Sequence, residues 1–68
     1  MADSVYKVVE LVGTSSKGWD QAAAAAVKRA QTSLRDLRVA EVTDLDLKLD
    51  DGSIVYRAKL KVSFKFEE

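Results

Sequence analysis

The chain has 68 residues, no cysteine, no histidine and no proline, and its 11 Lys and Arg balance its 11 Asp and Glu to a formal charge of zero. This composition excludes disulfides, disfavours a zinc site, and gives no general basic field for nucleic acid or anionic lipid. A chain of this length buries only about 60% of its unfolded surface on folding, so we expect self-association to supplement a marginal core.

The first residues, "MADSVYK", lack the charged and apolar regions of a signal peptide. No apolar run in the chain is long enough to span a bilayer. We therefore expect a soluble, cytoplasmic protein that forms one domain over residues 1–68.

The first predicted strand covers Val5 to Val12, which is rich in β-branched and aromatic residues. Its apolar side chains point to both faces, Val8 and Val12 to one face and Val9 and Leu11 to the other. A strand that is apolar on both faces is normally covered on both, and one helix covers only one. This pattern is a second indication of an oligomer.

The next segment, "GTSSKG" at residues 13–18, has the glycine spacing of a phosphate-binding loop. A P-loop continues with Lys and then Ser or Thr, whereas Trp19 and Asp20 follow here, and Asp20 would place a carboxylate against the phosphates. Nucleotide hydrolysis is therefore disfavoured. We interpret the loop as a helix entry, with Gly18 as the N-cap and Gln21 at the N3 position of a capping box.

An amphipathic helix of about five turns is predicted from Trp19 onward, because apolar residues recur at steps of three and four as far as Leu37. Trp19 is interpreted as an apolar lid over the first turn rather than as a stacking surface for a ligand. The alanines from Ala22 to Ala26 would permit a close approach by another chain.

Two further strands, Val39 to Leu49 and Ile54 to Phe66, flank the dipeptide Asp51-Gly52, which favours a two-residue hairpin turn. The turn fixes the pairing register of the hairpin. On one face the predicted pairs are Leu49–Ile54, Leu47–Tyr56, Leu45–Ala58 and Thr43–Leu60, and on the other face they are Asp46–Arg57, Asp44–Lys59 and Val42–Lys61. Each favourable cross-strand pair contributes about 0.2–1 kcal/mol.

The order of these elements predicts an α+β fold with a β-α-β-β subunit. A right-handed crossover places the third strand between the first and the second. The result is a three-stranded antiparallel sheet of order 1-3-2, packed on one helix.

The segments "VYKVVELVGTSSKGWDQAAAAAVKRA", "LRVAEV" and "YRAKLKVSF" resemble the dodecin family in order, length and spacing, over about residues 4–68. The most specific matches are "ELVGTS" and the pattern Tyr-x-x-x-Leu-Lys-Val-x-Phe from Tyr56 to Phe64. The resemblance implies a hollow homododecamer of β-α-β-β subunits. Members commonly bind paired flavins and act as storage or buffering proteins rather than as enzymes.

The resemblance places the family's flavin site at Val39, Asp46 and Arg57. Flavin-binding members have a stacking tryptophan within Leu-Arg-Trp-Phe-Glu-Val, where this chain has Val39 and Ala40 in "LRVAEV". They often have an arginine where Asp46 stands and a glutamine where Arg57 stands. Losing an aromatic platform forfeits about 1–3 kcal/mol per stacked ring, so we expect weak or absent binding of riboflavin or its phosphate.

Calcium is the second ligand that the resemblance suggests, because a branch of the family that lacks the stacking tryptophan is described as calcium-binding. Calcium takes about 6–8 oxygen ligands. Asp44 and Asp46 are the candidate ligands here, with the other acids of residues 41–51 contributing if symmetry brings copies together. The chain has no EF-hand spacing, so one copy cannot form the cage. The alternative is that these carboxylates pair with cations of the last strand or are solvated.

Three classes of function follow. The expected one is a dodecin-like, non-enzymatic, homododecameric protein that binds or stores a small ligand, with a degraded flavin site and calcium as a candidate. The alternatives are flavin binding and buffering, as in typical dodecins, and a ligand-free structural scaffold. An enzyme is disfavoured because the chain has no histidine or cysteine and no Ser or Thr beside an evident base.

Overall fold

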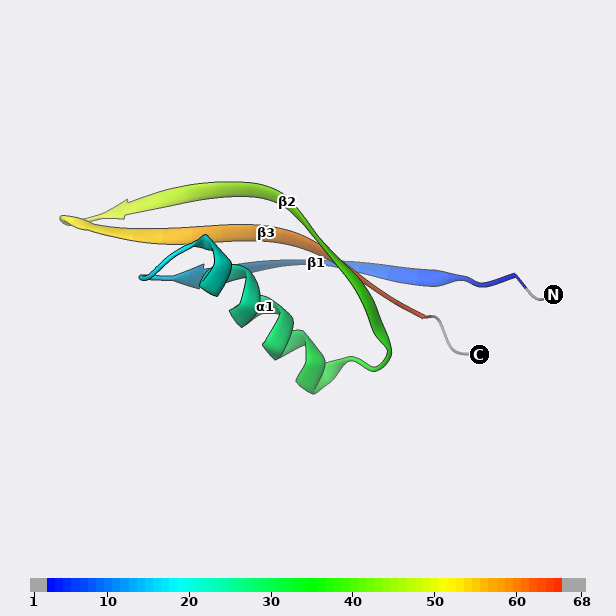
Figure 1. Cartoon of the computed structure of the whole chain (residues 1–68). Coiled ribbons are helices and arrows are strands. Elements are labelled where there is room, and N and C mark those ends of the chain that lie inside the picture. Colours follow the sequence, from blue (N-terminus) through cyan, green and yellow to red (C-terminus); the bar gives the residue numbers. More distant parts are fainter. Residues whose placement is uncertain (1–2, 66–68) are drawn as a thin grey trace.

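The computed structural model describes residues 3–65. Its elements are β1 (Tyr6–Ser15), α1 (Trp19–Ser33), β2 (Leu37–Asp50) and β3 (Ser53–Lys65). The sheet has the order β1-β3-β2 with both neighbouring pairs antiparallel, and α1 lies against one face of it (Figure 1). The predicted α+β fold and strand order are confirmed.

The turn between β2 and β3 is the one that the sequence predicts. Asp51 has a φ of 51° and Gly52 a φ of 86°, and positive φ at both central residues defines a type I′ turn. From this turn back to Asp44 the pairing follows the predicted register, with Asp46 opposite Arg57 and Asp44 opposite Lys59. The last predicted strand residue, Phe66, lies outside the described residues.

Beyond Asp44 the predicted register is wrong, because β2 contains a β-bulge at Thr43. Val42 lies opposite Leu60, and not opposite Lys61 as predicted. The predicted pair of Thr43 with Leu60 is therefore also absent. Compared with a regular strand, one extra residue at a bulge turns every preceding side chain to the opposite face of the sheet. The bulge therefore brings Val42 to the helix side, with Leu60.

The helix is shorter than predicted. It has 15 residues, or about four turns, and ends at Ser33, after which Leu34 is extended. Thr32 and Ser33 are poor helix formers, and Leu37 belongs to β2, where it lies opposite Phe64. Within residues 3–65 no helix has the length and apolar character needed to cross a membrane.

The N-cap is Gly18, as predicted, and its carbonyl accepts a hydrogen bond of 3.0 Å from the Ala22 N–H. The capping box is not formed, because no side chain bonds to the helix start. Asp20 lies in the first turn, where a negative charge is favourable.

Gly13 lies inside β1, which continues to Ser15, rather than at the end of the strand as predicted. It is buried, lies opposite Ala58, and faces α1. A Cβ at this position would overlap the Ala22 carbonyl oxygen and would lie 3.0 Å from the Ala26 Cβ. The absence of a side chain is what allows the helix to approach the strand.

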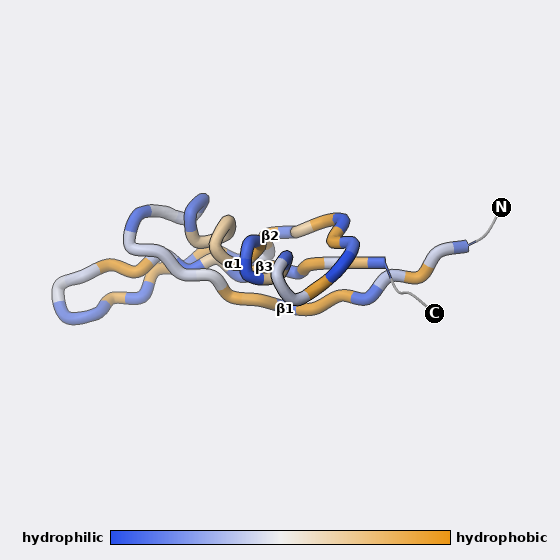
Figure 2. The backbone as a smooth tube through the Cα atoms, turned by 90° about the horizontal axis from the view of Figure 1, so that it is seen from below, coloured by the Kyte–Doolittle hydropathy of each residue, from blue (hydrophilic) through white to orange (hydrophobic). Residues whose placement is uncertain are grey.

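The core is small for the length of the molecule. Its buried residues are Ala22, Ala26, Ala30, Ala58, Leu60 and Val62. The molecule measures 54 × 20 × 14 Å and has a radius of gyration of 14.1 Å, against about 11 Å for a compact chain of this length. Large apolar side chains such as Val8 and Val12 of β1 therefore stay exposed, and Figure 2 shows that β1 contains a run of hydrophobic residues.

Candidate functional site

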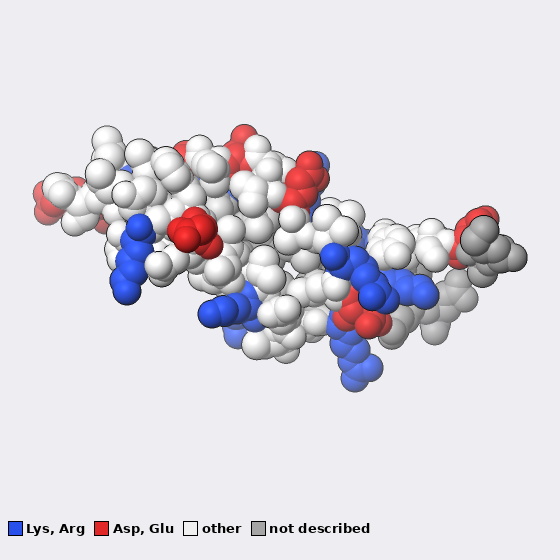
Figure 3. All heavy atoms as spheres, in the orientation of Figure 1, with Lys and Arg blue, Asp and Glu red and all other residues white. Residues whose placement is uncertain are grey.

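The face of the sheet opposite α1, which we call the open face, carries paired charges. Ala58, Leu60 and Val62 of β3 point under the helix, so the residues between them point to the open face. The cations of β3 on this face are Arg57, Lys59 and Lys61. Each lies opposite an acid of β2, in the pairs Arg57–Asp46, Lys59–Asp44 and Lys61–Glu41. Figure 3, in the orientation of Figure 1, shows Lys and Arg side chains and Asp and Glu side chains scattered over an otherwise uncharged surface.

The Arg57–Asp46 pair has bidentate geometry. Arg57 Nε donates to Asp46 Oδ1 at 2.6 Å and Nη2 donates to Oδ2 at 2.8 Å. Both side chains are 37% exposed, so the pair lies at the surface of the chain. Two parallel charged hydrogen bonds fix the guanidinium and the carboxylate in one plane, which is stronger than a single contact between point charges.

The pair also shifts the pKa values of its members. The hydrogen bond from Arg57 is the main cause that holds the pKa of the Asp46 carboxyl below its ordinary value of 3.8. Desolvation opposes it as the next largest effect, and the charges of Arg57 and Lys59 lower the pKa further. The same hydrogen bond and the Asp46 charge raise the pKa of Arg57. Both groups are therefore charged at neutral pH.

Trp19, at the start of α1, holds the main chain of Asp46 by a hydrogen bond from the helix side of the sheet. Its Nε1 donates to the Asp46 carbonyl oxygen at 3.1 Å, and its ring meets that of Tyr56 edge-on, with centroids 5.2 Å apart. The sequence pattern predicted an apolar lid over the first turn, and this link from the helix start to β2 was missed. It joins elements that are distant in sequence, so helical periodicity gives no indication of it.

The three positions of the family's flavin site share the open face. Val39 lies opposite Ser63 and is 61% exposed. Odd and even positions of a regular strand point to opposite faces, so Val39 and Asp46 share a face only because the Thr43 bulge lies between them. The bulge, which the sequence did not predict, therefore brings these three positions to one face. The direct contact among them is made by Asp46 and Arg57.

The two candidate metal ligands, Asp44 and Asp46, alternate along β2 and point to the open face. Within residues 3–65 no three acidic side chains come close enough together to hold a metal ion. Calcium needs about 6–8 oxygens, so the acids of one chain supply only part of a site.

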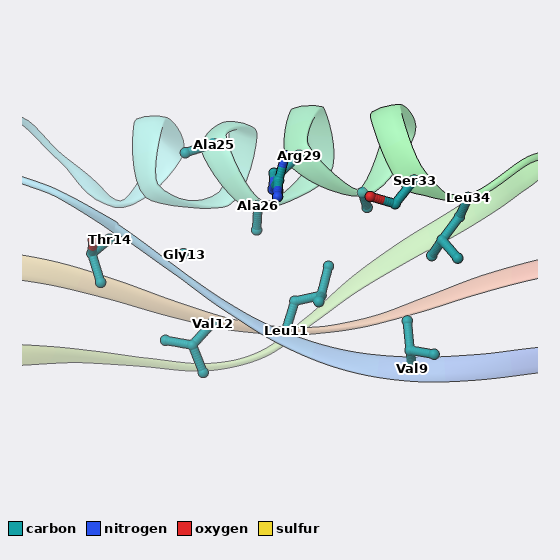
Figure 4. Close-up of a pocket in the computed structure, with 11 residues that line it drawn as sticks. Val9, Leu11, Val12, Gly13, Thr14, Ala25, Ala26, Arg29, Ser33 and Leu34 are labelled. Carbon is teal, nitrogen blue, oxygen red and sulfur yellow. The ribbon is translucent and has the colours of Figure 1, made fainter.

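A separate pocket of about 490 Å³ lies in a groove between α1 and β1 (Figure 4). Its lining residues are Val9, Leu11, Val12, Gly13, Thr14, Ala25, Ala26, Arg29, Ala30, Ser33 and Leu34. Arg29 is the charged member of this set, and no carboxylate is present. The groove is thus largely apolar and places no carboxylate against a cation.

Acid is expected to remove the stabilisation that the Asp46–Arg57 pair provides. Because the pKa of Asp46 is lower in the folded chain than in the unfolded chain, this stabilisation is complete well above pH 3.8 and disappears as the pH falls through the folded value. Urea unfolding of the wild type and of Asp46→Asn should differ at pH 7 and converge in acid. Asp44→Asn, which keeps the pair, should not converge in this way, and a pH-independent difference for Asp46→Asn would contradict the prediction.

Comparison with known proteins bears on the identity of this site. Residues 5–67 match the Dodecin family model. Calcium dodecin from Mycobacterium tuberculosis is 56% identical over 63 residues, covering 91% of this chain and 89% of that protein. Dodecin from Thermus thermophilus is 42% identical over 65 residues, covering 94% of each.

Solved structures agree with these relationships. The crystal structure of Mycobacterium tuberculosis calcium dodecin, described as having a novel calcium-binding site, has a TM-score of 0.87 and 54% identity, covering 94% of this chain and 93% of that one. Dodecin from Streptomyces coelicolor has a TM-score of 0.91 and 42% identity, covering 100% and 99%. The predicted resemblance is confirmed: the chain belongs to the dodecin family, and of these relatives it is most similar in sequence to calcium dodecin.

Proposed function

We propose that this protein is a non-enzymatic, calcium-binding member of the dodecin family that acts as a closed homododecamer and has a degraded flavin site. The observation that carries the proposal is the 56% identity with calcium dodecin, over 91% of the chain. Two features of the open face add to it, and a third feature supports assembly.

The first feature is the substitution of the flavin positions. Val39 offers no aromatic ring for stacking, and Asp46 and Arg57 satisfy each other through two hydrogen bonds. Trp19 and Tyr56 cannot replace the missing ring, because they pack against each other on the helix side of the sheet. A flavin would have to break an ion pair without gaining a stacking surface.

The second feature is the pair of acids that alternate on the open face. Asp44 and Asp46 give each chain two carboxylates that are neighbours on the open face of β2. Copies related by symmetry would bring several such pairs together and reach the coordination number that calcium needs. The absence of histidine and cysteine from the chain is consistent with a hard, oxygen-ligated cation and with a binding role rather than a catalytic one.

The third feature is exposed apolar surface, which supports assembly. Val8 and Val12 of β1 are 53% and 55% exposed on the open face. The other large apolar side chains that are exposed are Val5, Tyr6, Trp19, Val39, Val42, Leu45, Leu47, Leu49 and Ile54. Exposed apolar surface of this extent in a small chain marks an interaction surface.

Native mass spectrometry tests the proposal, because it reports stoichiometry and bound mass together. The protein, dialysed against calcium chloride and then against riboflavin, should give a twelve-chain species with bound calcium and little bound flavin. A monomer or dimer would overturn the assembly. An intact assembly without calcium or flavin would favour the scaffold function, and tight flavin binding would favour the typical dodecin function.

A matched variant tests the degraded site. Val39→Trp, Asp46→Arg and Arg57→Gln combined should raise riboflavin affinity about tenfold or more, because a stacked ring contributes about 1–3 kcal/mol. Val39→Trp alone should gain less, since the ion pair stays in place. Quenching of flavin fluorescence measures both. Strong quenching by the wild type at submicromolar concentration would show that the site is still functional.

A further inference from the structure

Both oxygens of the Asp46 carboxylate are held by hydrogen bonds in the arrangement described above. Each of its oxygens accepts a hydrogen bond from the same guanidinium, at 2.6 and 2.8 Å. A calcium ion would have to lie about 2.3–2.6 Å from one of these oxygens. A divalent ion and a guanidinium would then share one carboxylate at contact distance, where like charges repel strongly.

We propose that Arg57 is a specificity-determining residue, an internal counter-ion that a metal ion must displace before it binds Asp46. This inference rests on the proposed calcium-binding function. Asp44 lies opposite Lys59 but forms no salt bridge among the described residues, so its carboxylate is not held as that of Asp46 is. Binding at Asp44 and Asp46 together is therefore an exchange, in which Arg57 leaves as the metal ion arrives.

The exposure of the pair makes such an exchange feasible. Arg57 is 37% exposed, so the displaced guanidinium can turn into water instead of being left as an unpaired buried charge. An exposed pair is weak, and its competition lowers the affinity for calcium by about two- to fivefold per chain. The effect multiplies when several chains contribute to one site.

The exchange also discriminates between cations by charge. A sodium or potassium ion carries the same charge as the guanidinium and forms no comparable hydrogen bonds, so the exchange brings it no electrostatic gain. A divalent ion gains one unit of charge at the carboxylate. Arg57 thus excludes monovalent ions from Asp46 and sets the calcium concentration at which the site fills.

Trp19 gives a spectroscopic readout of this exchange. The chain has one tryptophan, and its N–H bonds to the carbonyl of Asp46. Movement of the Asp46 side chain from Arg57 to a metal ion changes the field at that carbonyl and at the indole. Calcium should therefore shift the tryptophan emission, and potassium chloride at equal ionic strength should not.

The decisive variant is Arg57→Lys, which keeps the charge but loses the planar fork that holds both carboxylate oxygens. Calorimetric titration of the assembled protein should give a calcium affinity about two- to fivefold above that of the wild type. Arg57→Gln should bind at least as tightly as Arg57→Lys. Lys65→Gln is the charge-matched control for Arg57→Gln, because Lys65 lies at the far end of β3, opposite Tyr6, and it should keep the wild-type affinity.

The outcomes distinguish the role of Arg57 from calcium binding itself. Calcium affinities of Arg57→Lys and Arg57→Gln equal to that of the wild type would overturn the role of Arg57 and leave calcium binding standing. A gain in Lys65→Gln as large as in Arg57→Gln would show that net charge alone acts, and would also overturn it. Failure of all four proteins to bind calcium would overturn the proposed function and this inference together.

Discussion

Gly13→Ala is expected to lower the free energy of unfolding by about 1–3 kcal/mol or more. The new Cβ would overlap the Ala22 carbonyl oxygen, and a backbone atom cannot rotate away as a side chain can. The helix must therefore move off β1 or tilt, and either movement weakens the contacts of Ala26 with the sheet. Urea unfolding at a fixed chain concentration measures the loss, since unfolding of an oligomer depends on concentration.

Gly52→Ala is the matched control for this change. Nothing lies within 4 Å of a Cβ at Gly52, but its φ of 86° is unfavourable for alanine. We expect a cost of about 1–2 kcal/mol from backbone conformation alone, without any change in helix packing. If Gly13→Ala unfolded at the same urea concentration as the wild type, the close approach of helix and strand would be disproved.

Leu60→Ala should cost about 2–5 kcal/mol, because it opens a cavity in the small core. Leu60 is 2% exposed and lies between α1 and the neighbouring strands. The core has few other large side chains, so little repacking can fill the cavity. Thermal unfolding at one chain concentration should show a lower midpoint for this variant.

The same substitution at Leu49 separates the core from the assembly. Leu49 is 77% exposed near the hairpin turn, so Leu49→Ala removes little packing within one chain. If a second copy covers this surface, the variant should weaken assembly at low concentration and leave the fold of each chain intact. Equal losses at Leu60 and Leu49, independent of concentration, would contradict the location of the core.

The sequence was sufficient for those features that a local motif determines. Asp51 and Gly52 specify a turn whose geometry fixes the pairing back to Asp44, and the Asp46–Arg57 pair lies within that span. Element order and the handedness of the crossover then place β3 in the centre of the sheet. For these reasons the fold and the central ion pair could be predicted.

Other features depend on competition between distant parts of the chain. The apolar positions of Leu34 and Leu37 continue the helical pattern, but pairing with β3 takes Leu37 into the sheet. Threonine is not a residue type that indicates a bulge, so the sequence gives no sign of one at Thr43. The Thr43 hydroxyl donates to the Lys59 carbonyl oxygen at 3.2 Å, and this contact exists only once the strands are paired. The metal ligands stay a prediction, because a complete set requires more than one chain.

The bulge at Thr43 also determines where β2 can change in length during evolution. Removing Thr43 would join Val42 to Asp44 and leave Leu60 and Lys59 as their partners, so no side chain would change face. A deletion at Leu45, with the turn unchanged, would instead rotate Asp44 to the helix side and take a carboxylate off the open face. We therefore expect gain or loss of one residue to be tolerated at the bulge and to be selected against between the bulge and the turn.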